Sequence, residues 1–318
     1  MNTLYLAKRV VIAFLSLFIV SSLVFGMTMA LPGSAAEIIL GTQQTEESVQ
    51  QVREEMGLNR PLHVRYLDFV VGTFTLDWGQ SLVSDQPVVD LIAPRLARTL
   101  QLALFAMLLS IVIAIPLGVI AAADRDTIVD TLITSVSYVG VSIPSFVSAS
   151  LLLLFLTTPP LDLFPTGGFV PFSEGFVPWL RHLILPAVSL NVIIFAYVLR
   201  QTRSSMIETL ESDYIRTARL KGLTERSVLA KHALRNGLLP TVTVLAINFG
   251  WMMGSVVIVE EIFSYPGMGR LIVQAISERD LPVIQAGILV PTAAFIFANL
   301  LADIVYTYLD PRIQLGEQ

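Results

Sequence analysis

The chain has no cysteine among its 318 residues. It therefore has no disulfide framework, no thiolate nucleophile and no cysteine-based metal site. Its three histidines, His63, His182 and His232, lie far apart without carboxylates at metal-ligand spacing, so no metal site is expected. No Gly-x-x-x-x-Gly-Lys-Ser/Thr loop occurs either, so the chain has no P-loop of its own. If ATP drives this protein, another subunit must bind it.

Charge is also scarce. Only 14% of the residues are charged, whereas 54% are hydrophobic, and the mean hydropathy is +0.72. A soluble domain carries about 25% charged residues. Because so few charges cannot cover the surface of a folded chain in water, the sequence predicts an all-α integral membrane protein.

Long uncharged runs give the number of membrane spans. A transmembrane helix needs roughly 20 apolar residues, and six stretches without Asp, Glu, Lys or Arg approach or exceed that length: Val10–Ala36, Thr99–Ala123, Thr131–Leu161, His182–Leu199, Asn236–Val259 and Leu281–Ala302. We expect one helix in each, with the fourth run the shortest. The first apolar core is longer than the about 7–15 residues of a cleavable signal, so we expect this helix to be retained.

The distribution of basic residues predicts the orientation. With the N-terminus in the cytoplasm, twelve Lys and Arg residues fall in short cytoplasmic segments and three in short outer loops. Both termini are therefore expected in the cytoplasm. Residues 1–98 would hold the first span and an outer segment, 99–309 a five-helix core, and 310–318 a tail. In the outer segment, Thr45–Gly57 predicts a short amphipathic helix that either covers the pathway or packs on the ends of the spans.

The cytoplasmic loop 200–240 inside this core is unusually long for a connection between two membrane helices, and long loops often carry function. Ser212 or Asp213 can cap a helix over Tyr214–Lys221, and Gly222 can end it in a left-handed conformation. A second short helix follows, with apolar residues toward the membrane or the bundle. The pattern predicts a positively charged helix–Gly–helix elbow, which either docks a partner or rests on anionic lipid headgroups.

This elbow resembles the EAA motif of permease subunits of ATP-binding-cassette importers, in the form found in the dipeptide, oligopeptide and nickel branch. Asp213–Leu223 and His232–Pro240 carry the resemblance. Arg216 and Thr217 replace the Glu and first Ala of the general motif, a departure typical of the peptide branch. Matching segments occur along nearly the whole chain: Leu31-Pro32-Gly33, Asp77-Trp78-Gly79, Ile143-Pro144-Ser145-Phe146, Phe263-Ser264-Tyr265-Pro266-Gly267-Met268-Gly269 and Leu309-Asp310-Pro311-Arg312.

The resemblance implies a type I importer permease of the inner membrane that works by alternating access. The elbow would then be a coupling helix seated in a partner ATPase, with these contact residues: Asp213, Tyr214, Arg216, Thr217, Ala218, Arg219, Lys221 and Gly222. The implied partners are a second permease, two ATPases that bind ATP and Mg, an extracytoplasmic solute-binding protein and membrane lipid, with no nucleic acid. The implied solute is a di- or oligopeptide; nickel, glutathione and other non-peptide solutes are the alternatives.

Polar and special residues within the spans suggest further sites. Four uncharged polar residues should face the bundle, where they either form interhelical hydrogen bonds or line a pathway: Gln101, Asn191, Asn248 and Asn299. Four prolines are expected to kink the spans: Pro116, Pro144, Pro186 and Pro291. At the outer end of the fifth span, Glu260 and Glu261 either meet the binding protein or a substrate amino group, or pair with outer-loop arginines.

Three other classes of membrane protein fit the sequence less well than a transport subunit does. A self-sufficient secondary transporter or channel would need charged groups at the span centres, and none occurs there. An intramembrane protease would need a Ser–His or paired-Asp constellation within the spans, and no Gly-x-Ser-x-Gly elbow is present. A lipid-anchored scaffold would leave the loop motif unexplained.

Overall fold

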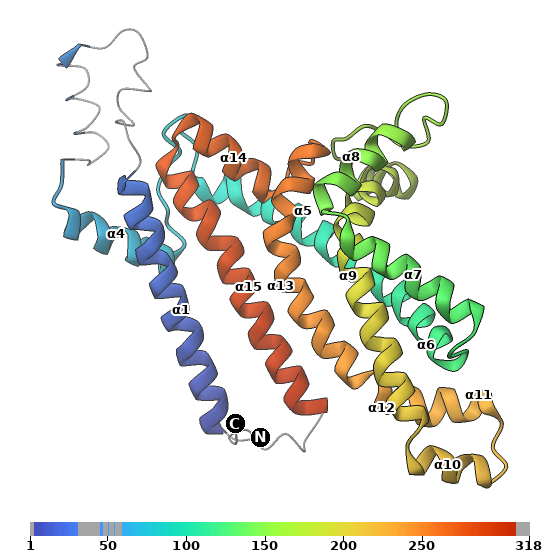
Figure 1. Cartoon of the computed structure of the whole chain (residues 1–318). Helices are drawn as coiled ribbons and strands as arrows, with labels where there is room; N and C mark the ends of the chain where they lie inside the picture. Colours follow the sequence, from blue (N-terminus) through green and yellow to red (C-terminus); the bar gives the residue numbers. More distant parts are fainter. Residues whose placement is uncertain (1–2, 31–44, 47–49, 51–53, 55–58, 310–318) are drawn as a thin grey trace. The chain divides into compact units, whose positions relative to one another are not determined.

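The computed structural model describes residues 3–30, 45, 46, 50, 54 and 59–309, and the described residues are predominantly helical (Figure 1). Helices suit a bilayer because they satisfy their backbone hydrogen bonds internally. Most of the outer helix predicted between Thr45 and Gly57 lies outside the described residues, and so does the tail 310–318.

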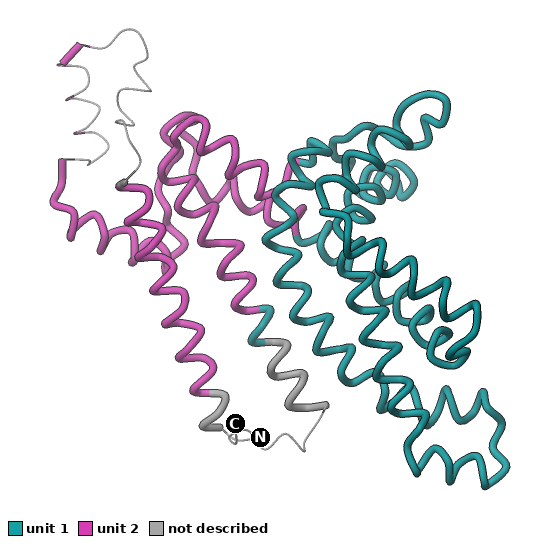
Figure 2. The backbone as a smooth tube through the Cα atoms, viewed as in Figure 1, with its two compact units in different colours: residues 1, 100–265, 298–318 teal, residues 2–99, 266–297 magenta. Residues whose placement is uncertain are grey.

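The chain divides into two compact units, which Figure 2 distinguishes by colour. Unit 1 includes residues 100–265 and 298–318, and unit 2 includes residues 2–99 and 266–297. One division falls between Thr99 and Leu100, next to the predicted limit of the N-terminal segment. Residues 266–297, which the sequence places with the core, group with the N-terminal unit.

Unit 2 contains α1 (Thr3–Ala30), α4 (Leu62–Thr75), the start of α5 (Val88–Leu109), α14 (Met268–Glu278) and the first part of α15 (Leu281–Leu309). Helix α1 carries the 23-residue apolar stretch Ala7–Met29, in which an 18-residue window has a mean hydropathy of 2.6 and is only 11% buried within the chain. Such a helix is stable with its side chains in lipid rather than in water.

The core of unit 2 joins segments from both ends of the chain. Val88 of α5 packs with Met268 of α14 and Val283 of α15. Nearby, the buried carboxylate of Asp280, between α14 and α15, accepts a hydrogen bond from the Ser81 hydroxyl. A buried carboxylate needs such a donor to offset its desolvation.

Unit 1 is built around α9 (Phe176–Leu210), a 35-residue helix. Helix α9 contacts α6 (Ile115–Ala123), α7 (Ile128–Ser142), α8 (Ser145–Leu156) and α13 (Leu239–Ile262). Buried apolar residues of α8, α9 and α13 form one cluster, against which the partly buried Ile115 and Leu117 of α6 and Ile133 of α7 pack. Because α9 touches four neighbours, a displacement of its end is felt by most of the unit.

The third predicted span is broken. Helices α7 and α8 meet at an angle of 105°, so the chain has five helices long and apolar enough to cross a membrane within the described residues, or six if this bent pair counts as one. The break falls at Pro144, which has no backbone N–H to donate. The residue before a proline also avoids the helical region, and Ile143 is extended, with φ −99° and ψ 116°.

The other expected kinks do not interrupt their helices. Pro186 lies inside α9 and Pro291 inside α15. Pro116 follows a π-helical turn, η1 (Ser110–Ala114), and the stretch 88–123 stays a single candidate span. A π turn widens the helix locally and so accommodates the missing proline N–H.

The fourth predicted span was the shortest uncharged run, but the helix that contains it is longer than the prediction. Helix α9 begins six residues before His182 and continues through Arg200 and Arg203 to Leu210. Charged residues end an apolar run without ending a helix, because Arg and Glu are both good helix formers. The cytoplasmic loop is therefore shorter than the interval between the charge-free runs suggests.

Candidate functional site

Helix α10 (Asp213–Leu220) forms the first arm of the predicted elbow, at the end of α9 (Figure 1). Ser212 occupies the N-cap position with extended dihedrals, and Asp213 places a carboxylate in the first turn, where the helix dipole favours it. Gly222 has φ +78°, and its N–H donates to the carbonyl of Arg219 at 2.9 Å. The helix therefore starts and ends within one residue of the predicted bounds, with glycine at the left-handed position.

One face of α10 is anchored to the rest of unit 1. Ile215 is fully buried and Ala218 nearly so, and both pack in a cluster with Met206 of α9. Ala218, predicted as a contact for the ATPase, thus lies against the chain's own bundle. The other predicted coupling residues are exposed: Asp213, Tyr214, Arg216, Thr217, Arg219, Lys221 and Gly222.

The second arm consists of α11 (Glu225–Ser227), the π-helical η3 (Val228–Ala233) and α12 (Leu234–Gly237). Val228 is fully buried in the same cluster as Ile215, so its apolar side faces the bundle rather than lipid. The sequence left open whether the apolar residues of this arm face the membrane or the bundle, and Val228 faces the bundle.

Two polar contacts tie the arms together. Arg219 donates to the carboxylate of Glu225, with Nε–Oε1 at 2.9 Å. This arginine, predicted as a contact for the ATPase, is therefore paired within the chain. Asn236 donates from its side-chain amide to the hydroxyl of Tyr214 at 3.1 Å. Both contacts are exposed and each contributes little alone, but together with the buried cluster they define the geometry of the elbow.

Gly237 of α12 lies close against Met206 and Thr209 of α9. A Cβ added at Gly237 would lie 2.5 Å from the Met206 sulfur and 3.2 Å from the Thr209 hydroxyl. Any larger side chain would require the buried Met206 side chain or the second arm to shift. Glycine at this position lets both arms of the elbow rest on the same short stretch of that helix.

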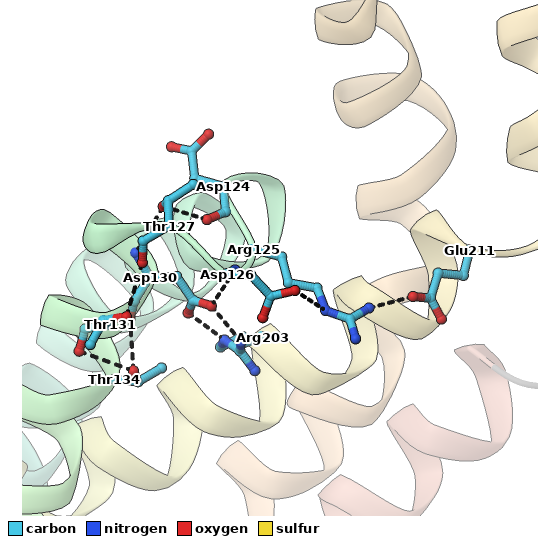
Figure 3. A network of polar contacts seen from close by, with 9 residues as sticks. All are labelled: Asp124, Arg125, Asp126, Thr127, Asp130, Thr131, Thr134, Arg203 and Glu211. Atoms are coloured by element: carbon cyan, nitrogen blue, oxygen red, sulfur yellow. Dashed lines mark hydrogen bonds and ion pairs between the residues drawn. The ribbon is translucent and has the colours of Figure 1, made fainter.

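An ion-pair network lies at the base of the elbow (Figure 3). Arg203 of α9 donates to both carboxylate oxygens of Asp130 in α7, with Nε–Oδ1 at 2.6 Å and Nη2–Oδ2 at 2.5 Å. The backbone N–H of Asp126 donates to the same carboxylate at 3.1 Å. The Asp130 side chain is only 6% exposed and that of Arg203 25%. A buried bidentate pair of this kind sets the geometry between two helices.

The same network continues to the last residue before the elbow. Arg125, in the turn between α6 and α7, contacts Asp126 at 3.4 Å and also donates to the carboxylate of Glu211. Glu211 directly follows α9. The α6–α7 turn is thus joined to the start of α10 by side chains, in addition to the packing of the helices.

Sequence reasoning missed Asp130 and Arg203. Each lies close to the end of an uncharged run, and both of these ends fall on the same predicted side of the membrane. Opposite charges at such positions are a signal for an interhelical pair. The sequence alone, however, does not say which of several arginines meets which acid.

A groove of about 560 Å³ lies within unit 1. It is lined by residues of α7, α8, α9 and α13: Val141, Ser145, Leu190, Ile193, Ile194, Tyr197, Val244, Ile247, Asn248, Trp251, Met252 and Ser255. None of these residues is charged, and Trp251 is 77% exposed. Close to the groove, the Arg200 guanidinium lies over the rings of Tyr138 and Tyr197 at 5.6 and 5.1 Å. This geometry suits a cation–π contact.

The predicted polar residues of the spans have different environments. Asn191 is buried in α9, and its side-chain oxygen accepts a hydrogen bond from Ser110 of η1, as expected for an interhelical contact. Asn248 lines the groove and donates to the carbonyl of Val244 in its own helix at 2.8 Å. Gln101 and Asn299 are half-buried on α5 and α15.

The two glutamates at the outer end of α13 differ in burial. The Glu260 side chain is fully buried, so it is withdrawn from any partner docking on that surface, whereas Glu261 is exposed. Only Glu261 is therefore placed to meet a partner or solute.

In the part of the chain that the structure describes, no group of His, Asp or Glu side chains is arranged to hold a metal ion.

Two family models cover nearly the whole chain. One, described as "Binding-protein-dependent transport system inner membrane component", matches residues 114–315. The other describes the N-terminal part of the membrane components of such systems and matches residues 2–103. The elbow, the ion-pair network and the groove all lie within the first match.

Curated relatives match over the same length. A putative peptide transport system permease protein of Brucella melitensis is 43% identical over 314 residues, which are 99% of this chain and 99% of the relative. The glutathione transport system permease protein GsiC of Escherichia coli is 37% identical over 310 residues, 98% of each chain.

A solved structure shares the fold. A chain of the MetNI methionine ABC transporter, in an inward-facing conformation, aligns with a TM-score of 0.57 at 16% identity. The alignment covers 69% of this chain and 96% of the other. At this identity the similarity concerns the fold only.

Proposed function

The chain belongs to the family of binding-protein-dependent transport system inner membrane components, and on this premise we propose that it forms half of the translocation pathway of an ATP-driven peptide importer. It is a multi-pass protein of the cell inner membrane. It acts as a transport subunit, and ATP and Mg are bound and used by two partner ATPases. A second, similar permease completes the pathway, and an extracytoplasmic binding protein delivers the solute.

The geometry of the elbow is the observation that carries this proposal. Helix α10 turns Tyr214, Arg216 and Lys221 outward while Ile215 is buried against α9. A helix that is exposed on one face and fixed on the other suits a part that receives force from a docked protein. Rigid-body motion of an ATPase at α10 would move the end of α9 instead of being absorbed locally.

The ion-pair network extends this route to a second helix. The Asp130–Arg203 pair joins α7 to α9 two turns before the elbow begins. We assign to it the role of making α7 follow α9 when the ATPases close. Since α7 and α9 both line the groove, the motion would change the width of the groove.

The uncharged groove supports a role as part of the pathway. Its walls offer aromatic and hydroxyl groups, and Asn248 supplies an amide. A lining without fixed charges does not trap a zwitterionic peptide, since tight binding inside a pathway would slow release. In this proposal both termini and the elbow lie in the cytoplasm, in accordance with the distribution of Lys and Arg.

Peptides are the proposed solute because the Brucella melitensis relative is described as a putative peptide permease. Glutathione, itself a modified tripeptide, is the second candidate, favoured by the similarity to GsiC. Binding of dipeptides, longer peptides and glutathione to the cognate binding protein, followed by uptake of each into proteoliposomes, distinguishes them. Uptake of none of these by the complete complex would contradict the proposed solute class.

Gly222 offers a direct test of the elbow. A Cβ added there would meet no atom within 4 Å, so a substitution acts only through the backbone at φ +78°. A β-branched residue is strained in this region by about 1–2 kcal/mol, whereas Asn tolerates it. In the reconstituted complex, Gly222→Val should lower peptide uptake roughly 5- to 30-fold while ATP hydrolysis continues, and Gly222→Asn should stay close to wild type. Normal uptake in Gly222→Val would contradict the coupling role.

A further inference from the structure

A second cavity lies in unit 2 and shares no lining residue with the groove. It has a volume of about 570 Å³ and is formed by α4, the turn 76–79 and the first turns of α15. Gly72 makes the close approach of this turn to α4 possible, because a Cβ there would lie 2.3 Å from the Asp77 carbonyl oxygen. Neither the elbow nor the groove uses any residue of this cavity.

The charges around the cavity leave one cation without a partner. Arg60 is paired with Asp68 at 2.7 Å, and the Asp77 carboxylate accepts a hydrogen bond from the backbone N–H of Gly79 at 3.2 Å. Arg65 also lines the cavity, and it has no hydrogen-bond or ion-pair partner among the described residues. Burial lowers the pKa of its guanidinium, yet an arginine stays protonated in proteins.

A second donor at the cavity is also unsatisfied. Trp78 lines the cavity, and its indole Nε1–H is buried without an acceptor in the part of the chain that the structure describes. Buried polar groups are nearly always hydrogen-bonded, and each exception requires an explanation. Because this N–H has almost no accessible surface, the donor open to a ligand is Arg65, and its guanidinium points to an anionic ligand rich in oxygen acceptors.

Part of the remaining cavity wall is apolar, beside the polar side chains of Thr75 and Gln285. Helix α4 packs along α1, with Phe69 against Phe25 and Phe74 against Phe14, so it lies beside a membrane span. Leu67 and Val71 line the cavity and are each 59% exposed. A soluble anion such as phosphate would make no apolar contact with Leu67 and Val71, whereas an acyl chain would pack against them.

We propose that α4 and the turn 76–79 bind a phospholipid, with the Arg65 guanidinium donating to the headgroup phosphate and the acyl chains lying along Leu67 and Val71. An arginine fork matches the geometry of a phosphate diester. An aromatic side chain beside it is typical of the membrane–water interface. The bound lipid would hold α4 against α1.

Native mass spectrometry of the full-length chain tests this site, with dioleoyl phosphatidylglycerol as the probe. The wild-type chain should retain one tightly bound lipid, and Arg65→Gln should weaken its apparent affinity at least about 10-fold, because a charge-assisted hydrogen bond is lost. Arg65→Lys keeps the charge without the fork and should lie between the two. Arg181→Gln, which removes an arginine that contacts the Leu163 carbonyl elsewhere, is the matched control and should bind as wild type.

Two further measurements separate the lipid from other ligands. Leu67→Asn should weaken lipid retention while leaving Arg65 in place, and glycerophosphate, which has the headgroup without acyl chains, should not displace the lipid at equal concentration. Equal lipid retention by Arg65→Gln and the wild type, both monodisperse, would overturn the site. Displacement by glycerophosphate would show a soluble anion site and overturn the lipid assignment. Neither result depends on transport activity, so the peptide proposal is tested separately.

Discussion

Removing the Asp130 carboxylate should destabilise unit 1 more than any exposed charge change near the elbow. In Asp130→Ala, Arg203 would lose both of its carboxylate contacts while its side chain stays only 25% exposed. The N-terminus of α7 would lose a second contact, because the Asp126 N–H donates to the same carboxylate. The variant therefore leaves a partly buried cation and a backbone donor without their acceptor.

The magnitude follows from the burial of the pair. Breaking a buried ion pair by removing one partner costs about 3–5 kcal/mol. Because Arg203 keeps a quarter of its exposure, we expect the lower end, about 3 kcal/mol. At roughly 2–4 °C per kcal/mol for a chain of this size, the unfolding midpoint should fall by about 6–12 °C. Glu211→Ala, which breaks a pair exposed by 47% and 66%, should cost under about 1 kcal/mol.

Tryptophan fluorescence of the protein in nanodiscs, followed on heating, measures these midpoints. A double-mutant cycle then isolates the pair: Asp130→Ala, Arg203→Met and the double variant should show a coupling of about 2 kcal/mol, because the double variant leaves no unpaired charge. If Asp130→Ala unfolded within a degree of the wild type, or if the two changes were additive, the pair would not join α7 to α9 energetically. In that case its proposed role in transmitting motion would also fail.

Two further predictions concern the elbow and the topology. Ile215→Ala removes a fully buried side chain and should destabilise α10 by about 2 kcal/mol, which amide hydrogen exchange would show as a roughly 30-fold faster rate in 213–220. Leu220→Ala, at a position 82% exposed, is the control and should change the exchange rate little. Equal exchange rates in both variants would contradict the anchoring of α10 by Ile215. Since the chain has no cysteine, Thr224→Cys should react with an impermeant maleimide only from the cytoplasmic side and Ser173→Cys only from outside. The reverse pattern would refute the proposed orientation.

Much of the architecture could be predicted because it depends on local properties of the sequence. Apolar runs of about 20 residues mark spans, since the hydrocarbon core excludes charge wherever the chain crosses it. The start and end of α10 were also predictable, because the capping position of Ser212 and the left-handed Gly222 depend on their immediate neighbours.

Two helices differ from the uncharged runs that contain them for a common reason. Helix α9 continues past Arg200, and the third run breaks at Pro144. Hydropathy reports what solvent a segment prefers, whereas helix ends depend on backbone hydrogen bonds and dihedrals. The position of Pro144 was visible in the sequence, but whether it would kink the span or end the helix depended on the residues packed around it.

By itself, the sequence determined that this protein is a helical membrane protein, that it has an elbow closed by Gly222, and that it resembles importer permeases. The tertiary structure alone decided that Asp130 meets Arg203, that Ala218 is turned inward and that Glu260 is buried. Composition and short-range periodicity act on each segment separately, so they can be read from the chain. A contact between positions 73 residues apart, such as that of Asp130 with Arg203, depends on how whole helices pack, and only the folded chain defines it.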